Sequence, residues 1–129
     1  MYICIDFDGT IVDHAFPVIG KPVPGAIEWM KKFVMHGADL ILWTVRCDNS
    51  EYGAVLTDAV NYLAHNNIEL YDVNNNKAQK SFSTSAKAWG HIYIDDAAYG
   101  CPLIKINDFM RPCVDWSIVG PDVLSMLQK

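Results

Sequence analysis

Three short apolar segments that each run directly into carboxylates or a hydroxyl constrain this chain most. The segments and the residues that follow them are Met1–Ile5 with Asp6 and Asp8, Leu40–Trp43 with Thr44, and Ile92–Ile94 with Asp95 and Asp96. In a parallel α/β sheet, the ligand crevice lies just past the carboxyl ends of the strands. If these segments are neighbouring parallel strands, two carboxylate pairs and a hydroxyl meet there. Such a set suits binding of a divalent cation and attack on a phosphoryl group.

Apolar segments alternate with stretches of helical periodicity along the chain. The expected strands cover 1–5, 39–44, 69–73, 91–95 and 103–106, and the expected helices cover 24–36, about 50–65 and 121–127. Asn49 or Ser50 is the expected cap of the second helix, and 74–86 is expected to be a loop with one helical turn. This alternation predicts an α/β fold with right-handed crossovers and a three-layer α/β/α sandwich.

Length and composition favour one ordinary globular domain over residues 1–129. The net charge is −5, and the eight lysines and two arginines are scattered, which argues against general binding of nucleic acids. No apolar run approaches the ~20 residues that a membrane-spanning helix needs, so no membrane association is expected. The cysteines lack paired metal-ligand spacing and predict reduced thiols in a cytoplasmic protein; they are Cys4, Cys47, Cys101 and Cys113.

Asp6 and Asp8 are two residues apart, so in extended backbone both carboxylates point to the same side. A cation between them would keep at least one carboxylate ionised and able to attack. A strand in front and Gly9 in the fourth position argue against a calcium-binding EF-hand loop, which requires a preceding helix and a glycine in the sixth position. The alternative for the pair alone is a polar turn after a strand.

Thr44 and Arg46 follow the second strand at the expected crevice. The Thr44 hydroxyl can hold a phosphate oxygen, although a threonine that ends a strand is more often structural. The planar guanidinium of Arg46 suits phosphate or carboxylate recognition, and a surface arginine is the equal alternative.

Asp95 and Asp96 are adjacent carboxylates that repel each other, and a divalent cation would relieve this repulsion; a capped turn is the alternative. Lys87 precedes this pair and is a candidate to neutralise a phosphate. Lys77 and Lys80 compete with it, and each lysine taken singly fits a solvated side chain. Among the four histidines, which otherwise fit structural positions, His14 follows the first acidic pair and is the exception to watch.

The chain resembles the haloacid dehalogenase (HAD) superfamily of phosphohydrolases. Its four motifs occur here in order over most of the chain: Asp6, Asp8 and Thr10 in the segment DFDGT, then Thr44, then Lys87, then Asp95 with Asp96. The match is closer to small bacterial and phage-type HAD hydrolases, through 19–26 (IGKPVPGA), 42–46 (LWTVR) and 93–96 (YIDD).

The resemblance implies a parallel Rossmann-like fold and a role for each matched residue. Asp6 is implied as the nucleophile that forms an aspartyl-phosphate, and Asp8 as the general acid and base. Thr10 is implied to orient Asp8, and Thr44 and Lys87 to bind the phosphoryl group. Mg²⁺ is implied to be held by Asp6, Asp8 (through its main-chain carbonyl), Asp95 and Asp96.

The spacing of the motifs leaves no room for a cap domain. Only 33 residues separate Thr10 from Thr44 and 42 separate Thr44 from Lys87, so an open pocket is expected, with loop 13–20 as the nearest movable cover. Capless members act on large or tethered phosphates or borrow a lid from a second subunit, which leaves a homo-oligomer open.

The leading hypothesis is a Mg²⁺-dependent phosphomonoester phosphatase whose phosphorylated substrate the sequence does not identify. Two alternatives stay open: a non-catalytic or weakly active module that binds metal or phosphate, and a phosphotransferase that uses an acceptor other than water. A receiver domain would share the acidic pocket but normally lacks the carboxylate at the position of Asp8.

Overall fold

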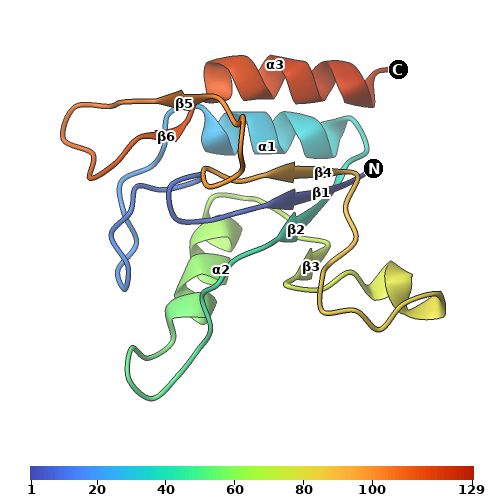
Figure 1. Ribbon diagram of the computed structural model, residues 1–129, viewed down its shortest axis with the longest axis horizontal. Coiled ribbons are helices and arrows are strands. Elements are labelled where there is room, and N and C mark those ends of the chain that lie inside the picture. Colours follow the sequence, from blue (N-terminus) through green and yellow to red (C-terminus); the bar gives the residue numbers. More distant parts are fainter.

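The computed structural model describes residues 1–129 and has a parallel four-stranded sheet at its centre, in the strand order β3-β2-β1-β4 (Figure 1). The sheet strands are β1 (Tyr2–Ile5), β2 (Asp39–Leu42), β3 (Asp72–Val73) and β4 (Ile92–Ile94). The remaining elements are α1 (Ala26–Met35), α2 (Val55–His65), the 3-10 helix η1 (Lys77–Ser81), β5 (Leu103–Ile104), β6 (Cys113–Val114) and α3 (Trp116–Leu127).

Strand β1 lies between β2 and β4 in the sheet, and its sequence is apolar on both faces. Ile5 pairs with Leu42 on one side and with Ile94 on the other. The carboxyl ends of the three strands are therefore level with one another. A parallel strand covered on both faces has no solvated side, so it needs a continuous apolar run.

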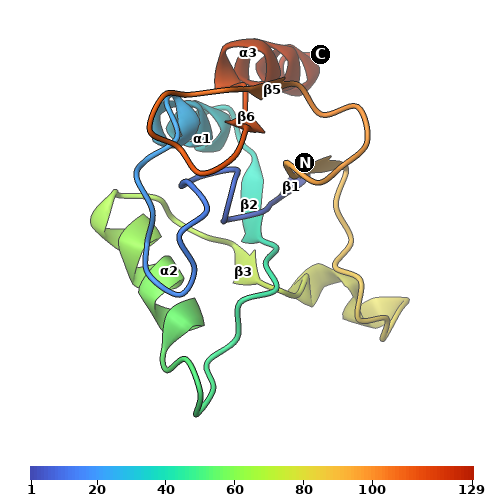
Figure 2. The same cartoon turned by 60° about the vertical axis from the view of Figure 1, so that its left-hand side comes forward.

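All three α-helices cover the same face of the sheet. The side chains that point to this face from β1 and β2 alternate along each strand, and they share one core with buried residues of all three helices. The core residues of these elements are Ile3, Ile5, Leu40, Leu42, Met30, Phe33, Ala59, Leu63, Trp116 and Val123. Figure 2 shows the helices on one side of the sheet and η1 on the other.

The opposite face of the sheet carries no α-helix. Cys4 and Ile41 point to this face and form a small core with Ala88 from the segment that leads into β4. The steps from β1 to β2 and from β2 to β3 move in one direction across the sheet, so right-handed crossovers place α1 and α2 on one face. The return from β3 to β4 covers the other face with only η1 and loop. The expected three-layer sandwich is thus present only in reduced form.

Two expected elements near the C-terminus differ in the structure. Leu103–Ile104 does not extend the parallel sheet; it pairs antiparallel with β6, which the sequence analysis did not predict. Helix α3 begins at Trp116 rather than at Pro121, because the side chain of Asp115 accepts a hydrogen bond from the Ser117 N–H and caps the helix there.

Helix α2 begins at Val55, later than expected. Asn49 and Gly53 exchange two main-chain hydrogen bonds in a tight turn, so neither Asn49 nor Ser50 caps the helix. Asp48 does so instead, since its Oδ1 accepts the N–H groups of Leu56 (2.9 Å) and Thr57 (3.0 Å). The single helical turn expected in 74–86 is η1. None of the helices has the length and apolar character needed to cross a membrane.

Gly120 lets α3 approach α1, because a Cβ at this position would overlap the indole ring of Trp29. We expect Gly120→Ala to lower the free energy of unfolding by about 1–2 kcal/mol, because overpacking outweighs the gain in helix propensity. Urea unfolding measures this change. Ser125→Ala, at an exposed position of the same helix, is the matched control and should change stability little. A Gly120→Ala variant as stable as the unaltered protein would contradict this account of the helix packing.

Candidate functional site

Three carboxylates meet at the carboxyl end of the sheet. Asp6 follows β1, and Asp95 and Asp96 follow β4, the neighbouring strand. One oxygen from each of these residues can be chosen so that all lie within 4.8 Å of one another. The side chains are partly buried and close enough for one divalent cation to contact all three. The expected convergence of the first and fourth motifs is therefore seen in the structure.

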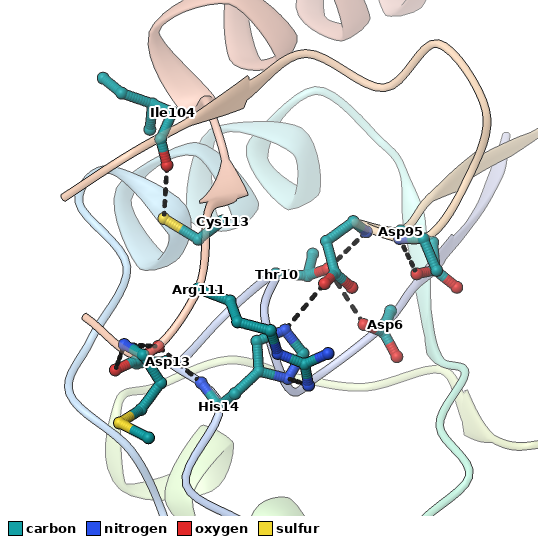
Figure 3. Close-up of polar contacts among 11 residues, drawn as sticks. Asp6, Thr10, Asp13, His14, Asp95, Ile104, Arg111 and Cys113 are labelled. Carbon is teal, nitrogen blue, oxygen red and sulfur yellow. Dashed lines mark hydrogen bonds and ion pairs between the residues drawn. The ribbon is translucent and has the colours of Figure 1, made fainter.

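Thr10 connects two of these carboxylate residues (Figure 3). Its hydroxyl donates to Asp6 Oδ2 (3.1 Å) and accepts the main-chain N–H of Asp96 (3.1 Å). Thr10 is completely buried, so its hydroxyl is shielded from water. Thr10 was expected to orient Asp8, and in the structure it orients Asp6 instead.

Asp6 is strongly destabilised as an anion. The pKa of its carboxyl group is raised to about 8, by burial first and by the neighbouring Asp95 and Asp96 next, while the hydrogen bond from Thr10 lowers it. The pKa of Asp95 is also raised, by burial first and by Asp96 next. A bound divalent cation would reverse this effect, because it favours the ionised form of each carboxyl group.

Asp8 is held away from this cluster by Arg46. Arg46 Nε donates to Asp8 Oδ2 and Arg46 Nη2 to Asp8 Oδ1, both at 2.8 Å, which is a bidentate ion pair. The other three N–H groups of Arg46 donate to the main-chain carbonyls of Pro17, Val18 and Val55. All five donors of the guanidinium are used.

This saturation corrects the expected role of Arg46. Arg46 is only 1 % exposed, and its guanidinium has no donor left for a phosphate group. The guanidinium instead fixes Asp8 and joins it to loop 13–20 and to the start of α2. The carboxylate of Asp8 is likewise not one of the three that can share a cation.

Thr44 borders a cavity of about 380 Å³ that also contains Asp6, Asp95 and Asn74 in its wall. Asn74 directly follows β3, and its Oδ1 accepts the Thr44 N–H (2.8 Å). The Thr44 hydroxyl accepts the main-chain N–H of Arg46 (3.1 Å) and so keeps its own proton free to donate. The side-chain NH₂ group of Asn74 and the main-chain N–H of Val45 make no hydrogen bond within the chain. These groups form a set of donors beside Asp6.

None of the three candidate lysines lies at the carboxylates. Lys87 is exposed and lines a different cavity with Trp89, its ammonium 5.3 Å from the centre of the Tyr93 ring. Lys77 donates to the main-chain carbonyl of Tyr71, and Lys80 is exposed on η1. No lysine lines either of the cavities that contain Asp6. The expected convergence of Lys87 with the other motifs is not seen in the structure.

A second cavity, of about 460 Å³, shares Asp6, Val45 and Asp95 with the first and is also bordered by His14 and Arg111. His14 Nε2 lies 2.9 Å from Asp96 Oδ2, and Arg111 Nη2 lies 2.8 Å from His14 Nδ1 (Figure 3). Arginine can only donate, so Nδ1 accepts and the ring proton resides on Nε2, which donates to Asp96. Gly9 is required beside this pair, because a Cβ there would overlap both His14 and Asp96.

Neither Asn74 nor Arg111 is predicted from the sequence, which also defines no role for His14. A signal for Asn74 existed: it follows a predicted parallel strand, as do Asp6 and Asp95. Arg111 lies in the hairpin between β5 and β6, which was itself not predicted, so no pattern in the sequence connected it with the site.

The raised pKa of Asp6 predicts a pH dependence of stability without divalent cations. Between the ordinary carboxyl value of 3.8 and about 8, the folded state binds a proton that the unfolded state releases. The free energy of unfolding therefore falls as pH rises through this window, by up to about 1.4 kcal/mol per pH unit. Urea unfolding from about pH 5 to pH 8, in buffers that contain a chelator, measures this change in the free energy of unfolding. The slope should be shallower in Asp6→Asn, which keeps only the smaller contribution of the raised pKa of Asp95, and a flat profile in the unaltered protein would contradict the assignment.

No protein-family model matches the chain, and no curated protein matches it. Among solved structures, the chain is similar to a conserved protein of Bacteroides thetaiotaomicron, with 30 % sequence identity and a TM-score of 0.76. The similarity covers 98 % of this chain and 91 % of that one. This chain belongs to the same family as that conserved Bacteroides protein.

Proposed function

We propose that the chain is a Mg²⁺-dependent phosphohydrolase of the HAD superfamily, with a capless Rossmann-like core and an aspartyl-phosphate intermediate on Asp6. One observation carries the proposal: Asp6 lies between two further carboxylates and a group of hydrogen-bond donors suited to bind a phosphate group. Thr44 and Asn74 border it on one side, and Asp95 and Asp96 border it on the other. The motif resemblance supports the same assignment.

The donor set fits a divalent cation of the Mg²⁺ type. Asp6, Asp95 and Asp96 offer only carboxylate oxygens, which Mg²⁺ prefers, and it usually binds through one or two carboxylates, water and substrate phosphate. No histidine nitrogen is available to it, because His14 uses Nε2 to donate to Asp96. When bound, the cation supplies positive charge that favours ionised Asp6 and offsets charge on the phosphoryl oxygens.

Asp6 is placed to act as the nucleophile. Thr10 donates to its Oδ2 and fixes its orientation, which leaves the second oxygen of the carboxylate to attack phosphorus. In the first step, a carboxylate oxygen of Asp6 forms a bond to phosphorus while the bond from phosphorus to the ester oxygen breaks. In the second step, the oxygen of a water molecule forms a bond to phosphorus while the bond between Asp6 and phosphorus breaks. The water gives a proton to Asp8, and the products are the Asp6 carboxylate and inorganic phosphate.

The donors beside Asp6 are suited to hold the phosphoryl group during these steps. The Thr44 hydroxyl, the Asn74 amide and the Val45 N–H have free protons at this side of the cavity. Preorganised neutral donors stabilise the charge that spreads over phosphoryl oxygens in the transition state. We assign to them the phosphate-binding role that the motif comparison gave to Lys87.

Asp8 is the candidate general acid that protonates the leaving group. It lines the cavity with Asp6, but both of its oxygens accept from Arg46 in this structure. To deliver a proton, Asp8 has to turn away from Arg46 and carry that proton to the ester oxygen. Arg46 is therefore a positioning residue for the resting state of Asp8.

The same ion pair is the observation that favours a second candidate, a module that binds metal and phosphate with little turnover. If Asp8 stays paired with Arg46, it cannot act as an acid.

Transfer of the phosphoryl group to an acceptor other than water is a further alternative. It uses the same residues and differs from hydrolysis only in the second step.

Asp6→Asn should abolish Mg²⁺-dependent hydrolysis of an aryl phosphate, with a loss of at least about 10³-fold in kcat, because the amide cannot form the intermediate. Steady-state assays with Mg²⁺ and with a chelator measure this loss. Asp39→Asn is the control: Asp39 is exposed and begins β2 at the opposite end of the sheet, so its removal should leave turnover unchanged. Full activity of Asp6→Asn would exclude Asp6 as the nucleophile.

Asp8→Asn should slow the cleavage of alkyl phosphates more than that of 4-nitrophenyl phosphate, because a poor leaving group depends on a proton donor. The expected loss for the alkyl ester is about 10²–10⁴-fold. Comparing kcat/KM for both esters in both proteins provides the measurement. Equal losses for the two leaving groups would remove Asp8 from the acid role and favour the weakly active module.

A further inference from the structure

We infer that Arg111 binds a second anionic group of the substrate, separate from the phosphoryl group that is transferred. This inference rests on the proposed function, since it assigns the substrate class of that same site. It predicts a phosphomonoester that carries another phosphate or a carboxylate on its leaving-group side.

The position of Arg111 is built into the fold by a buried carboxylate. Asp13 is only 4 % exposed, and it accepts the main-chain N–H of Met110 with both oxygens, at 3.2 and 3.0 Å. The same carboxylate accepts the N–H of His14 (2.7 Å). Asp13 thus joins the residue before Arg111 to the residue that Arg111 contacts (Figure 3).

Arg111 is the only basic side chain with free donors at the cavity that contains Asp6 and Asp96. The chain has two arginines, and Arg46 uses all of its donors within the protein. Arg111 makes one hydrogen bond, to His14, and forms no ion pair, although four carboxylates line the same cavity. Its remaining N–H groups are available to a ligand. A guanidinium is the side chain best shaped to bind phosphate or carboxylate with two parallel hydrogen bonds.

The histidine between Arg111 and Asp96 determines which anionic group can reach the guanidinium. Asp96 belongs to the cluster around Asp6, and the whole imidazole of His14 separates it from Arg111. Arg111 is therefore one side chain further out than the carboxylates. A phosphoryl group at Asp6 is held by the donors that line the cavity with Thr44, which Arg111 does not border, so Arg111 is placed to meet another part of the substrate.

The test compares two phosphonate probes that resist hydrolysis and differ by one anionic group. Calorimetry at a fixed concentration of free Mg²⁺ gives the Kd of propylphosphonate and of propane-1,3-diphosphonate, whose second anionic group lies three carbons from the first. We expect the unaltered protein to prefer the diphosphonate. Arg111→Met should reduce that preference by about tenfold or more, since a charge-assisted hydrogen bond contributes about 1.5–3 kcal/mol. Arg111→Lys should retain part of it.

Lys105→Met is the matched control, because Lys105 is an exposed cation of the same hairpin that does not line the cavity. It should keep the full preference. The inference is overturned if the unaltered protein shows no preference, if Arg111→Met weakens both probes equally, or if Lys105→Met matches Arg111→Met. The aryl phosphate assay separates the two proposals. Loss of the preference in a protein that hydrolyses the aryl phosphate would overturn this inference alone, whereas an Arg111-dependent preference in a protein that does not hydrolyse it would overturn the proposed function alone.

Discussion

Mutual repulsion among three partly buried carboxylates is the constraint on which the rest of this site depends. The parallel pairing of β1 with β4 sets Asp6 beside Asp95 and Asp96, and burial removes the water that would screen their charges. Thr10, itself fully buried, holds Asp6 in place by a hydrogen bond and ties it to the main chain of Asp96. The fold therefore maintains an arrangement that is unfavourable without a cation and favourable with one.

The two arginines of the chain divide the positive charge of the site between structure and ligand binding. Arg46 lies in the core, contacts the rings of Phe7 and Phe16 from 5.0 and 5.3 Å, and uses every donor to fix Asp8 and loop 13–20. Arg111 lies at the surface and has N–H groups that make no hydrogen bond. A guanidinium that is saturated by the protein organises its neighbours, whereas one with free donors can recognise an anion. Residue type alone could not separate these two roles.

The sequence was sufficient to predict the parallel strands and the meeting of the carboxylates, because both follow from local patterns. An apolar run that ends in Asp6, or in Asp95, identifies a strand and its carboxyl end at once. The placement of α1 and α2 on one face follows from right-handed crossovers once the strand order is known, but the order itself was not predicted. What the sequence could not provide were contacts between segments far apart in the chain. Arg46 reaches Asp8 across 38 residues, and Arg111 reaches His14 across 97.

For Lys87 the sequence suggested a contact that the structure does not contain. Its position in the motif order suggested the site, but its backbone lies on the face of the sheet that η1 covers.

The most direct test of this account is the number of protons released when Mg²⁺ binds. Calorimetric titration with Mg²⁺ at pH 7, in buffers of different ionisation enthalpy, measures that number. A carboxyl group whose pKa is about 8 without a cation should lose its proton on binding, so the account predicts release of about one proton per bound ion, and almost none from Asp6→Asn. Binding of Mg²⁺ without proton release, or equal release from both proteins, would contradict it.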